Sequence, residues 1–240
     1  MKFGWKFWLV TMAAILAVAT TASLGRWQLS RAAEKMALQS SIDTQFRAQA
    51  LDTQALASHP DPTQLIHRRL KLRGRWLTDR TVFLDNRQMG GRVGMYVLTP
   101  LQLEGSSLVV LVQRGWVLRN FLDRTALAPI HTPLGSVEVE GRIVPPPSKL
   151  YEIGPSQPGL IRQNLDLPSF SAELGAPLVA MSVQQIGATS EGLLRDWPVP
   201  GTGVDKHYGY AFQWFGLCGL ISILYVWFQL VRRFTSAGPS

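Results

Sequence analysis

Residues 207–231 read HYGYAFQWFGLCGLISILYVWFQLV and contain no Asp, Glu, Lys or Arg. A second uncharged stretch, FWLVTMAAILAVATTASL, covers residues 7–24 near the N-terminus. Apolar stretches of about 18 residues or more are long enough to cross a lipid bilayer as helices. The sequence therefore predicts two transmembrane helices, at 7–24 and 207–231, with residues 25–206 outside the bilayer.

The charge distribution indicates how such helices would be oriented. Only 17% of the 240 residues are charged, against about 25% in ordinary soluble proteins. The net charge is +8, and four basic residues beside the predicted spans account for half of it: Lys2, Lys6, Arg232 and Arg233. Because basic residues favour the cytoplasmic side of a membrane, we expect both termini in the cytoplasm. A high pI of this origin indicates membrane orientation more than nucleic-acid binding.

In a Gram-negative bacterium this topology places the protein in the inner (plasma) membrane, with residues 25–206 in the periplasm. An alternative is a cleaved signal peptide, because the start is basic and Ala17-Val18-Ala19 resembles a small-residue cleavage site. Against cleavage, the apolar stretch continues to Leu24 and a helical pattern follows it directly. The single cysteine, Cys218, excludes an internal disulfide.

The segment between the spans changes character near residue 58. Residues 25–57 are rich in helix-forming types and predict a helix, which His59-Pro60 would end. From residue 70 onward apolar and polar residues alternate, which is typical of half-buried strands. Strands are expected at 69–73, 81–85, 94–103, 108–117, 137–144, 160–165 and 178–186.

A short helix is predicted between the last two strands, beginning at Pro168 and ending at Gly175. The predicted fold class is a membrane-anchored α+β protein, in which two transmembrane helices flank a mainly antiparallel β domain. A sandwich or a partly open barrel would cover strands of this kind.

Known catalytic signatures are missing from the sequence. There is no Gly-x-Ser-x-Gly, no phosphate-binding loop and no His-Glu-x-x-His, and none of the four histidines is spaced for two metal ligands on one helix face. We therefore expect that the protein is not an enzyme. An enzyme acting on lipid or the cell envelope stays open as an alternative.

The basic run RRLKLRGRW at residues 68–76 is of a kind found in nucleic-acid-binding proteins. Outside the cytoplasm there is little nucleic acid to bind, so we expect no nucleic-acid partner. The favoured interpretation is an exposed strand face. Anionic lipid headgroups and the carboxylates of a ligand are the remaining alternatives.

His207 is the leading candidate for a binding residue, because it stands at the start of the second predicted span. The partial positive charge of a helix N-terminus disfavours a protonated imidazole, and a neutral imidazole is the form that binds iron. Tyr210, Ala211 and Trp214 follow at helical spacing on the same face. The pattern predicts an aromatic-walled site for a flat apolar ligand; an interfacial aromatic belt is the alternative.

Four stretches, in this order, resemble the Surfeit locus protein 1 family of cytochrome c oxidase assembly factors. They are LGRWQLSR at 24–31, the hairpin VLTPL…VLVQRGWV at 97–117, Trp197-Pro198, and HYGYAFQWF at 207–215. One departure is Gln113, where many members have Asn. Together the matches extend over nearly the whole chain.

The resemblance implies an inner-membrane chaperone that binds haem a and aids its insertion into cytochrome c oxidase subunit I. It implies His207 as the ligand of the haem iron. It also places Tyr210, Gln213 and Trp214 beside His207, and Trp27, Gln28 and Arg31 at the exit of the first span. Haem a synthase and membrane lipid are further implied partners. We expect a cation to meet the haem propionates, and three candidates are available: Arg26, Arg31 and Lys206. The alternative is a haem-independent scaffold that holds oxidase subunits.

Overall fold

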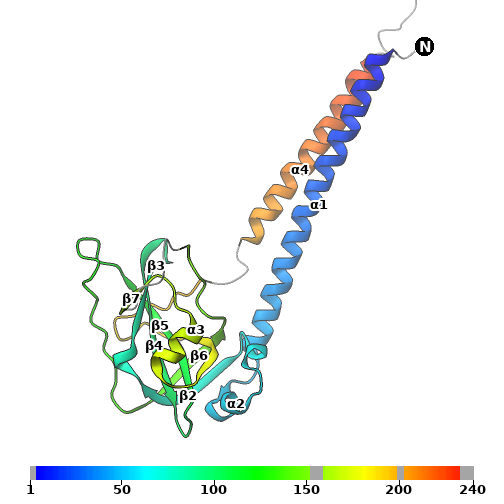
Figure 1. Cartoon of the computed structure of the whole chain (residues 1–240). Helices are drawn as coiled ribbons and strands as arrows, with labels where there is room; N and C mark the ends of the chain where they lie inside the picture. The colour runs from blue at the N-terminus through cyan, green and yellow to red at the C-terminus, as the bar shows by residue number, and fades with distance from the viewer. Residues whose placement is uncertain (1–3, 152–158, 199–202, 233–240) are drawn as a thin grey trace, which may run out of the picture. The chain divides into compact units, whose positions relative to one another are not determined.

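The computed structural model describes residues 4–151, 159–198 and 203–232 (Figure 1). The chain forms two compact units, Met1–Ser41 with Val199–Ser240, and Ile42–Pro198. Lys2 and Arg233, on which part of the topology prediction depends, lie outside the described residues, as do residues 199–202 before the second span.

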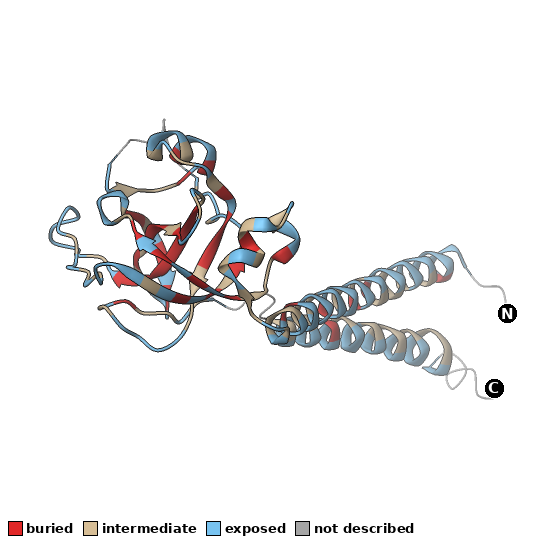
Figure 2. Cartoon of the chain, turned by 90° about the horizontal axis from the view of Figure 1, so that it is seen from below, coloured by how far each residue is buried: buried red, intermediate tan, exposed pale blue. Residues whose placement is uncertain are grey.

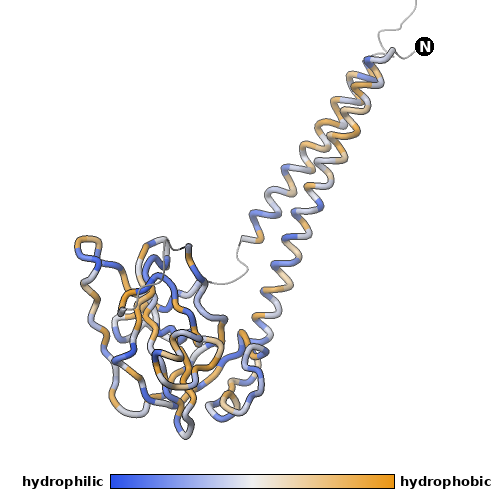
Figure 3. Tube along the Cα trace, in the orientation of Figure 1, coloured by the Kyte–Doolittle hydropathy of each residue, from blue (hydrophilic) through white to orange (hydrophobic). Residues whose placement is uncertain are grey.

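The first unit is built from two long helices. Helix α1 is Trp5–Arg47, and helix α4 is Val204–Tyr225, which continues as the π-helical segment η3, Val226–Val231. Each contains a stretch long and apolar enough to cross a membrane, and apolar residues run along both of them (Figure 3). The predicted spans are therefore helical over their described residues.

The two helices pack antiparallel along one seam. Thr11 near the start of α1 hydrogen-bonds Tyr225 near the end of α4, with 2.9 Å between Oγ1 and Oη. Side chains that are buried or half-buried recur every three or four residues, the spacing of a coiled-coil seam. On α1 they are Phe7, Thr11, Ala14, Val18, Thr21, Gly25, Gln28 and Ala32, and on α4 His207, Ala211, Trp214, Cys218, Ile221 and Tyr225.

The helix predicted over 25–57 ends earlier, at Arg47. Leu51–Asp52 instead form strand β1, which pairs in parallel with Leu70 and Lys71. Asp52 then caps the short helix α2, Thr53–Ser58, through an Oδ1 atom that accepts the Ala55 N–H at 2.7 Å. Strand pairing and side-chain capping therefore outweigh the helix propensity of these residues.

The second unit is a closed barrel of five strands: β2 (Arg69–Trp76), β4 (Arg92–Leu103), β5 (Val109–Leu118), β6 (Ser136–Val144) and β8 (Leu178–Gln185). Their order is β2-β6-β8-β5-β4, and β4 pairs back to β2. All pairs are antiparallel except β5–β8. The β-rich, mainly antiparallel character is confirmed, but the ring is closed, so the expected sandwich or partly open barrel is wrong. Closure depends on the β2–β4 pairing.

The barrel unit also contains shorter elements and one further strand. Strand β3, Val82–Met89, forms a hairpin with β4 through Gly90 and Gly91, whose φ angles are +57° and +74°. The strand expected at 160–165 shrinks to β7, Ile161–Arg162. Helix α3, Leu167–Leu174, is confirmed and ends at Gly175 in the left-handed conformation. Two 3₁₀ turns, η1 (Pro62–Leu65) and η2 (Thr78–Arg80), complete the described elements.

The barrel is filled by aliphatic side chains, and Figure 2 colours much of the strands as buried. Strand β2 illustrates the pattern, because Leu70 and Leu72 are fully buried while Lys71 and Arg73 between them are exposed. The basic run of residues 68–76 therefore forms an exposed strand face. The main core cluster contains Leu56, Leu70, Leu72, Leu101, Val110, Val112, Val139, Ile143, Met181 and Val183.

Candidate functional site

His207 lies in the first turn of α4, on the seam that faces α1. Its ring is half-buried, and Nδ1 is 2.8 Å from Oε1 of Gln28. Gln28 comes from α1, just beyond the uncharged stretch of the first predicted span. The two helices thus bring together residues that are 179 positions apart in the sequence.

This hydrogen bond sets the chemical form of the imidazole. An amide oxygen can only accept, so Nδ1 of His207 carries the proton and donates it to Gln28. In the neutral ring with this tautomer, Nε2 keeps its lone pair and is the atom available to a metal. Histidines that ligate metals in proteins usually donate their other ring N–H in this way. The arrangement therefore suits binding of iron through Nε2.

The two predicted aromatic neighbours on α4 take different positions. Trp214 is half-buried on the seam, in line with His207 and the buried Ala211. Tyr210 is 53% exposed and lies to one side of this line. The structure thus places Trp214 between the helices and Tyr210 on the flank of the pair.

Trp27 and Arg31 lie on a flank of α1. Trp27 is 51% exposed, and the Arg31 guanidinium is 5.7 Å from the centre of its ring. Arg31 also forms an ion pair with Glu34 at 2.8 Å. Because exposed ion pairs contribute only about 0–1 kcal/mol, an anionic ligand could replace Glu34 at small cost.

Helical spacing and the antiparallel register place Trp27, Arg31 and Tyr210 on the same side of the helix pair. The opposite side is marked by Tyr208, whose hydroxyl contacts Sδ of Met36 at 3.6 Å. Aromatic rings and a cation therefore gather on one side of the pair.

Two further basic residues were predicted to meet propionates. Lys206 is exposed and directly precedes His207, and helical spacing puts it on the flank of Tyr210. Arg26, two residues before Gln28, falls about 160° from Gln28 around α1, away from the seam. Of the three candidate cations, Arg31 and Lys206 are therefore positioned beside the site.

The hairpin motif Arg114-Gly115-Trp116 lies in the barrel unit and has a structural role there. The Arg114 side chain is 0% exposed and binds Glu191 at 2.9 Å and Thr132 Oγ1 at 2.7 Å. Its guanidinium also lies 4.8 Å from the centre of the Trp76 ring. Arg195 approaches the same Glu191 at 3.4 Å. Burial lowers the pKa of Arg195, and the negative charge of Glu191 opposes that shift.

The rest of this motif fixes the segment that precedes α4 in the sequence. The backbone of Trp116 exchanges two hydrogen bonds with Leu194, at 2.8 and 2.9 Å. A Cβ atom on Gly115 would come within 2.7 Å of the Leu194 carbonyl oxygen, so this close approach depends on glycine. The Arg195 Nε–H donates to the Arg114 carbonyl at 2.9 Å. Sequence reasoning named the hairpin motif but not Leu194 or Arg195, because their contact with it depends on the fold.

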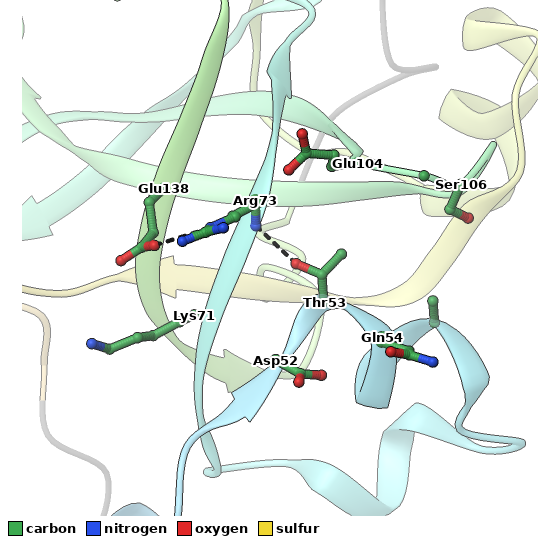
Figure 4. A pocket seen from close by; sticks show the side chains of 10 residues that line it. Asp52, Thr53, Gln54, Lys71, Arg73, Glu104, Ser106 and Glu138 are labelled. Atoms are coloured by element: carbon green, nitrogen blue, oxygen red, sulfur yellow. Dashed lines mark hydrogen bonds and ion pairs between the residues drawn. The ribbon is translucent and has the colours of Figure 1, made fainter.

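A shallow depression of about 630 Å³ lies on the barrel surface beside β2 (Figure 4). Arg73 forms an ion pair with Glu138 at 3.2 Å, and its backbone N–H donates to Thr53 Oγ1 at 2.8 Å. The lining residues carry both signs of charge: Asp52, Lys71, Arg73, Glu104 and Glu138, with Thr53, Gln54, Ala57, Gly105 and Ser106. Nowhere in residues 4–151, 159–198 and 203–232 do three His, Cys, Asp or Glu side chains gather as a metal site would require.

The chain thus combines a closed five-stranded β-barrel with two helices, before and after it in the sequence, that are long and apolar enough to span a membrane. A hydrogen-bonded histidine lies on the seam between these helices. The model of the SURF1 family matches residues 15–219, and the chain belongs to this family. The resemblance inferred from the sequence is confirmed, and the family is known as one of oxidase assembly factors.

Relatives in animals and bacteria match along most of their length. The chain is 28% identical to a SURF1-like protein of Drosophila melanogaster, over 91% of this chain and 77% of the relative. It is 26% identical to a SURF1-like protein of Rickettsia bellii, over 84% of this chain and 83% of that relative. The chain is 25% identical to Surfeit locus protein 1 of Rattus norvegicus, over 90% of this chain and 74% of that relative.

Proposed function

We propose that this protein is an assembly factor for haem-copper cytochrome c oxidase that binds haem a and aids its insertion into subunit I. Family membership supports a role in oxidase assembly. The observation that carries the haem proposal is the hydrogen bond between Gln28 and His207, which leaves Nε2 of the imidazole free to bind iron. The protein acts as a carrier and catalyses no covalent step.

The residues around His207 fit a haem. Iron in a macrocycle needs only one or two protein ligands, and a single imidazole is a common one. Trp27 and Tyr210 supply exposed aromatic surface on the same side of the helix pair, and Trp214 lines the seam. Arg31 and Lys206 supply cations on that side for carboxylates. The iron, the macrocycle and the carboxylates of the ligand thus each have a matching side chain.

The topology is part of the proposal. Both helices cross the inner membrane, both termini lie in the cytoplasm, and the barrel lies in the periplasm. Lys6 and Arg232, at the ends of the helix pair opposite His207, support this orientation because basic residues favour the cytoplasmic side. Labelling of single cysteines at the two ends of the pair in intact cells tests it.

Spectroscopy of the purified full-length protein tests haem binding. Protein made in cells that synthesise haem a should show a Soret band, and pigment extraction should identify haem a. His207→Ala should lose most of this haem, whereas His131→Ala, the same change at an exposed barrel position, should keep it. Equal haem content in wild type and His207→Ala would remove His207 from the mechanism.

A haem-independent scaffold is the second candidate function. The polar, mixed-charge depression beside β2 favours it, because such a surface suits a polar segment of a partner protein more than a flat apolar ligand. A scaffold should co-purify with subunit I, and with haem a synthase if that partner is correct, even when haem a synthesis is blocked. Loss of both associations in such cells would contradict this candidate.

A further inference from the structure

The segment between β5 and β6 carries large apolar side chains that contact little of the protein. Phe121 is 65% exposed, and Leu122 is fully exposed. The segment stands away from the barrel in Figure 1. We refer to residues 118–124 as the β5–β6 tip. Soluble domains seldom present adjacent large apolar side chains at such a position without a binding partner.

Local hydrogen bonds hold the β5–β6 tip in this shape. Oδ1 of Asn120 accepts the backbone N–H groups of Leu122 and Asp123, at 2.9 and 3.1 Å. Oδ1 of Asp123 accepts the hydroxyl and the backbone N–H of Thr125, at 2.6 and 2.8 Å. These two bonds, the hydroxyl's first, hold the pKa of Asp123 below its usual value. The turn therefore has a defined conformation that keeps Phe121 and Leu122 pointing outward.

Basic residues flank the apolar ones. The Arg119 guanidinium lies 5.0 Å from the centre of the Phe121 ring and pairs with Asp85 at 3.4 Å. Arg124 is exposed and has no ion-pair partner among the described residues. Apolar side chains bordered by arginines are typical of segments that enter the headgroup region of an anionic bilayer.

We propose that the β5–β6 tip inserts into the interface of an anionic membrane, with Phe121 and Leu122 at the headgroup–acyl boundary and Arg124 on lipid phosphates. Two observations favour a membrane as the partner of the β5–β6 tip. The tip carries basic residues, and helices α1 and α4, before and after the barrel in the sequence, are each long and apolar enough to cross a membrane. These helices would tether the barrel's chain to a bilayer. The proposal stands apart from haem binding and does not use His207.

The single native cysteine makes a site-specific test possible. Cys218→Ser removes it with little change in size, and Leu122→Cys then carries an environment-sensitive fluorophore. The full-length protein is placed in nanodiscs of phosphatidylethanolamine and phosphatidylglycerol. The matched control is Glu104→Cys, an exposed position in the turn at the other end of strand β5. Near-native circular dichroism of each labelled protein establishes that it is folded.

In nanodiscs, the fluorophore at position 122 should emit at a shorter wavelength than the same fluorophore does in aqueous buffer. Spin-labelled lipid in the nanodisc should quench its emission. The fluorophore at position 104 should do neither. Arg124→Ser should lower the inserted-to-free ratio about fivefold, the effect of one basic residue at an anionic surface. Replacing phosphatidylglycerol by phosphatidylcholine should also lower the inserted-to-free ratio.

Solvent-like emission at position 122 in every lipid composition would overturn the proposal, as would equal quenching at positions 122 and 104. A blue shift at position 122 without quenching by lipid would also overturn it, because the apolar residues would then be covered by protein. None of these outcomes depends on whether the preparation contains haem.

Discussion

Oε1 of Gln28 accepts a hydrogen bond from Nδ1 of His207 across the two helices of the pair, at 2.8 Å. Because the amide oxygen accepts, Nδ1 is the ring nitrogen that donates, and of the two neutral tautomers Gln28 selects the one that keeps the lone pair on Nε2. Gln28 is therefore a positioning residue for the nitrogen proposed to bind iron.

The first prediction concerns Gln28→Leu. Without the acceptor, His207 should populate both neutral tautomers, which ¹⁵N NMR of the haem-free protein would show as a shift of both ring nitrogens. Haem affinity should fall about 10–100-fold, as is typical when a partner of a metal ligand is removed. The NMR result tests the role of Gln28 even if the protein binds no haem.

Gln213→Leu is the control for this change, because Gln213 is exposed on α4 and belongs to the same motif. It should leave both the tautomer and the haem content unchanged. If wild-type His207 carries its proton on Nε2, or if Gln28→Leu binds haem as tightly as wild type, Gln28 has no positioning role.

Local sequence patterns predicted much of the fold. Alternation around Leu70 and Leu72 located β2, and Gly175 marked the end of α3, because both signals depend on near neighbours. Helix α1 was predicted to run too far, since its end at Arg47 depends on the pairing of Leu51 with Leu70. Closure of the barrel likewise depends on contacts between distant strands, which one sequence does not reveal.

The candidate site was predicted in part for the same reason. His207 and its neighbours on α4 share one helix, so their spacing could be read directly. The role of Gln28 depends on which residues of α1 face α4, and no single-helix pattern specifies that register. Arg114 was recognised only through family resemblance, and its burial with Glu191 could not have been inferred from the strand pattern.

The second prediction concerns the buried charges of the barrel. Arg114→Met removes one partner of an ion pair whose arginine is fully buried, so the free energy of unfolding should fall by about 3 kcal/mol. Arg73→Met removes an exposed pair with Glu138 and should cost less than about 1 kcal/mol. Urea unfolding of the two variants measures the difference. Equal losses would show that the Arg114 network is not a special source of stability.

The third prediction concerns Gly115→Ala. The added methyl group would meet the Leu193 side chain and the Leu194 carbonyl oxygen, both at 2.7 Å, and a backbone oxygen cannot move without displacing its segment. We expect a loss of about 1–3 kcal/mol in unfolding free energy. Hydrogen exchange should accelerate at the amides of Trp116 and Leu194, each of which donates to the carbonyl oxygen of the other residue. Unchanged exchange at these amides would contradict the close approach of Gly115 to the Leu194 carbonyl oxygen.

The last prediction concerns pH and His67, a residue of the barrel unit with a φ angle of +75°. Burial, with a smaller effect from the positive charge of Arg142, lowers its pKa below the ordinary value of 6.5. The buried Nδ1 also has no hydrogen-bond partner among the described residues. The unfolded chain therefore binds a proton more readily than the folded one, so stability should fall as the pH drops through about 6.5 and below.

His67→Asn removes the titrating ring and keeps a residue type that tolerates positive φ. Its urea midpoint should therefore decline less than that of wild type between about pH 7.5 and pH 5.5. The pKa of Glu173 is lowered chiefly by its hydrogen bond to Arg162, so Glu173 affects stability only at more acidic pH. It therefore does not contribute to the difference between wild type and His67→Asn in this range. Parallel declines in the two proteins would show that His67 does not limit stability in this range.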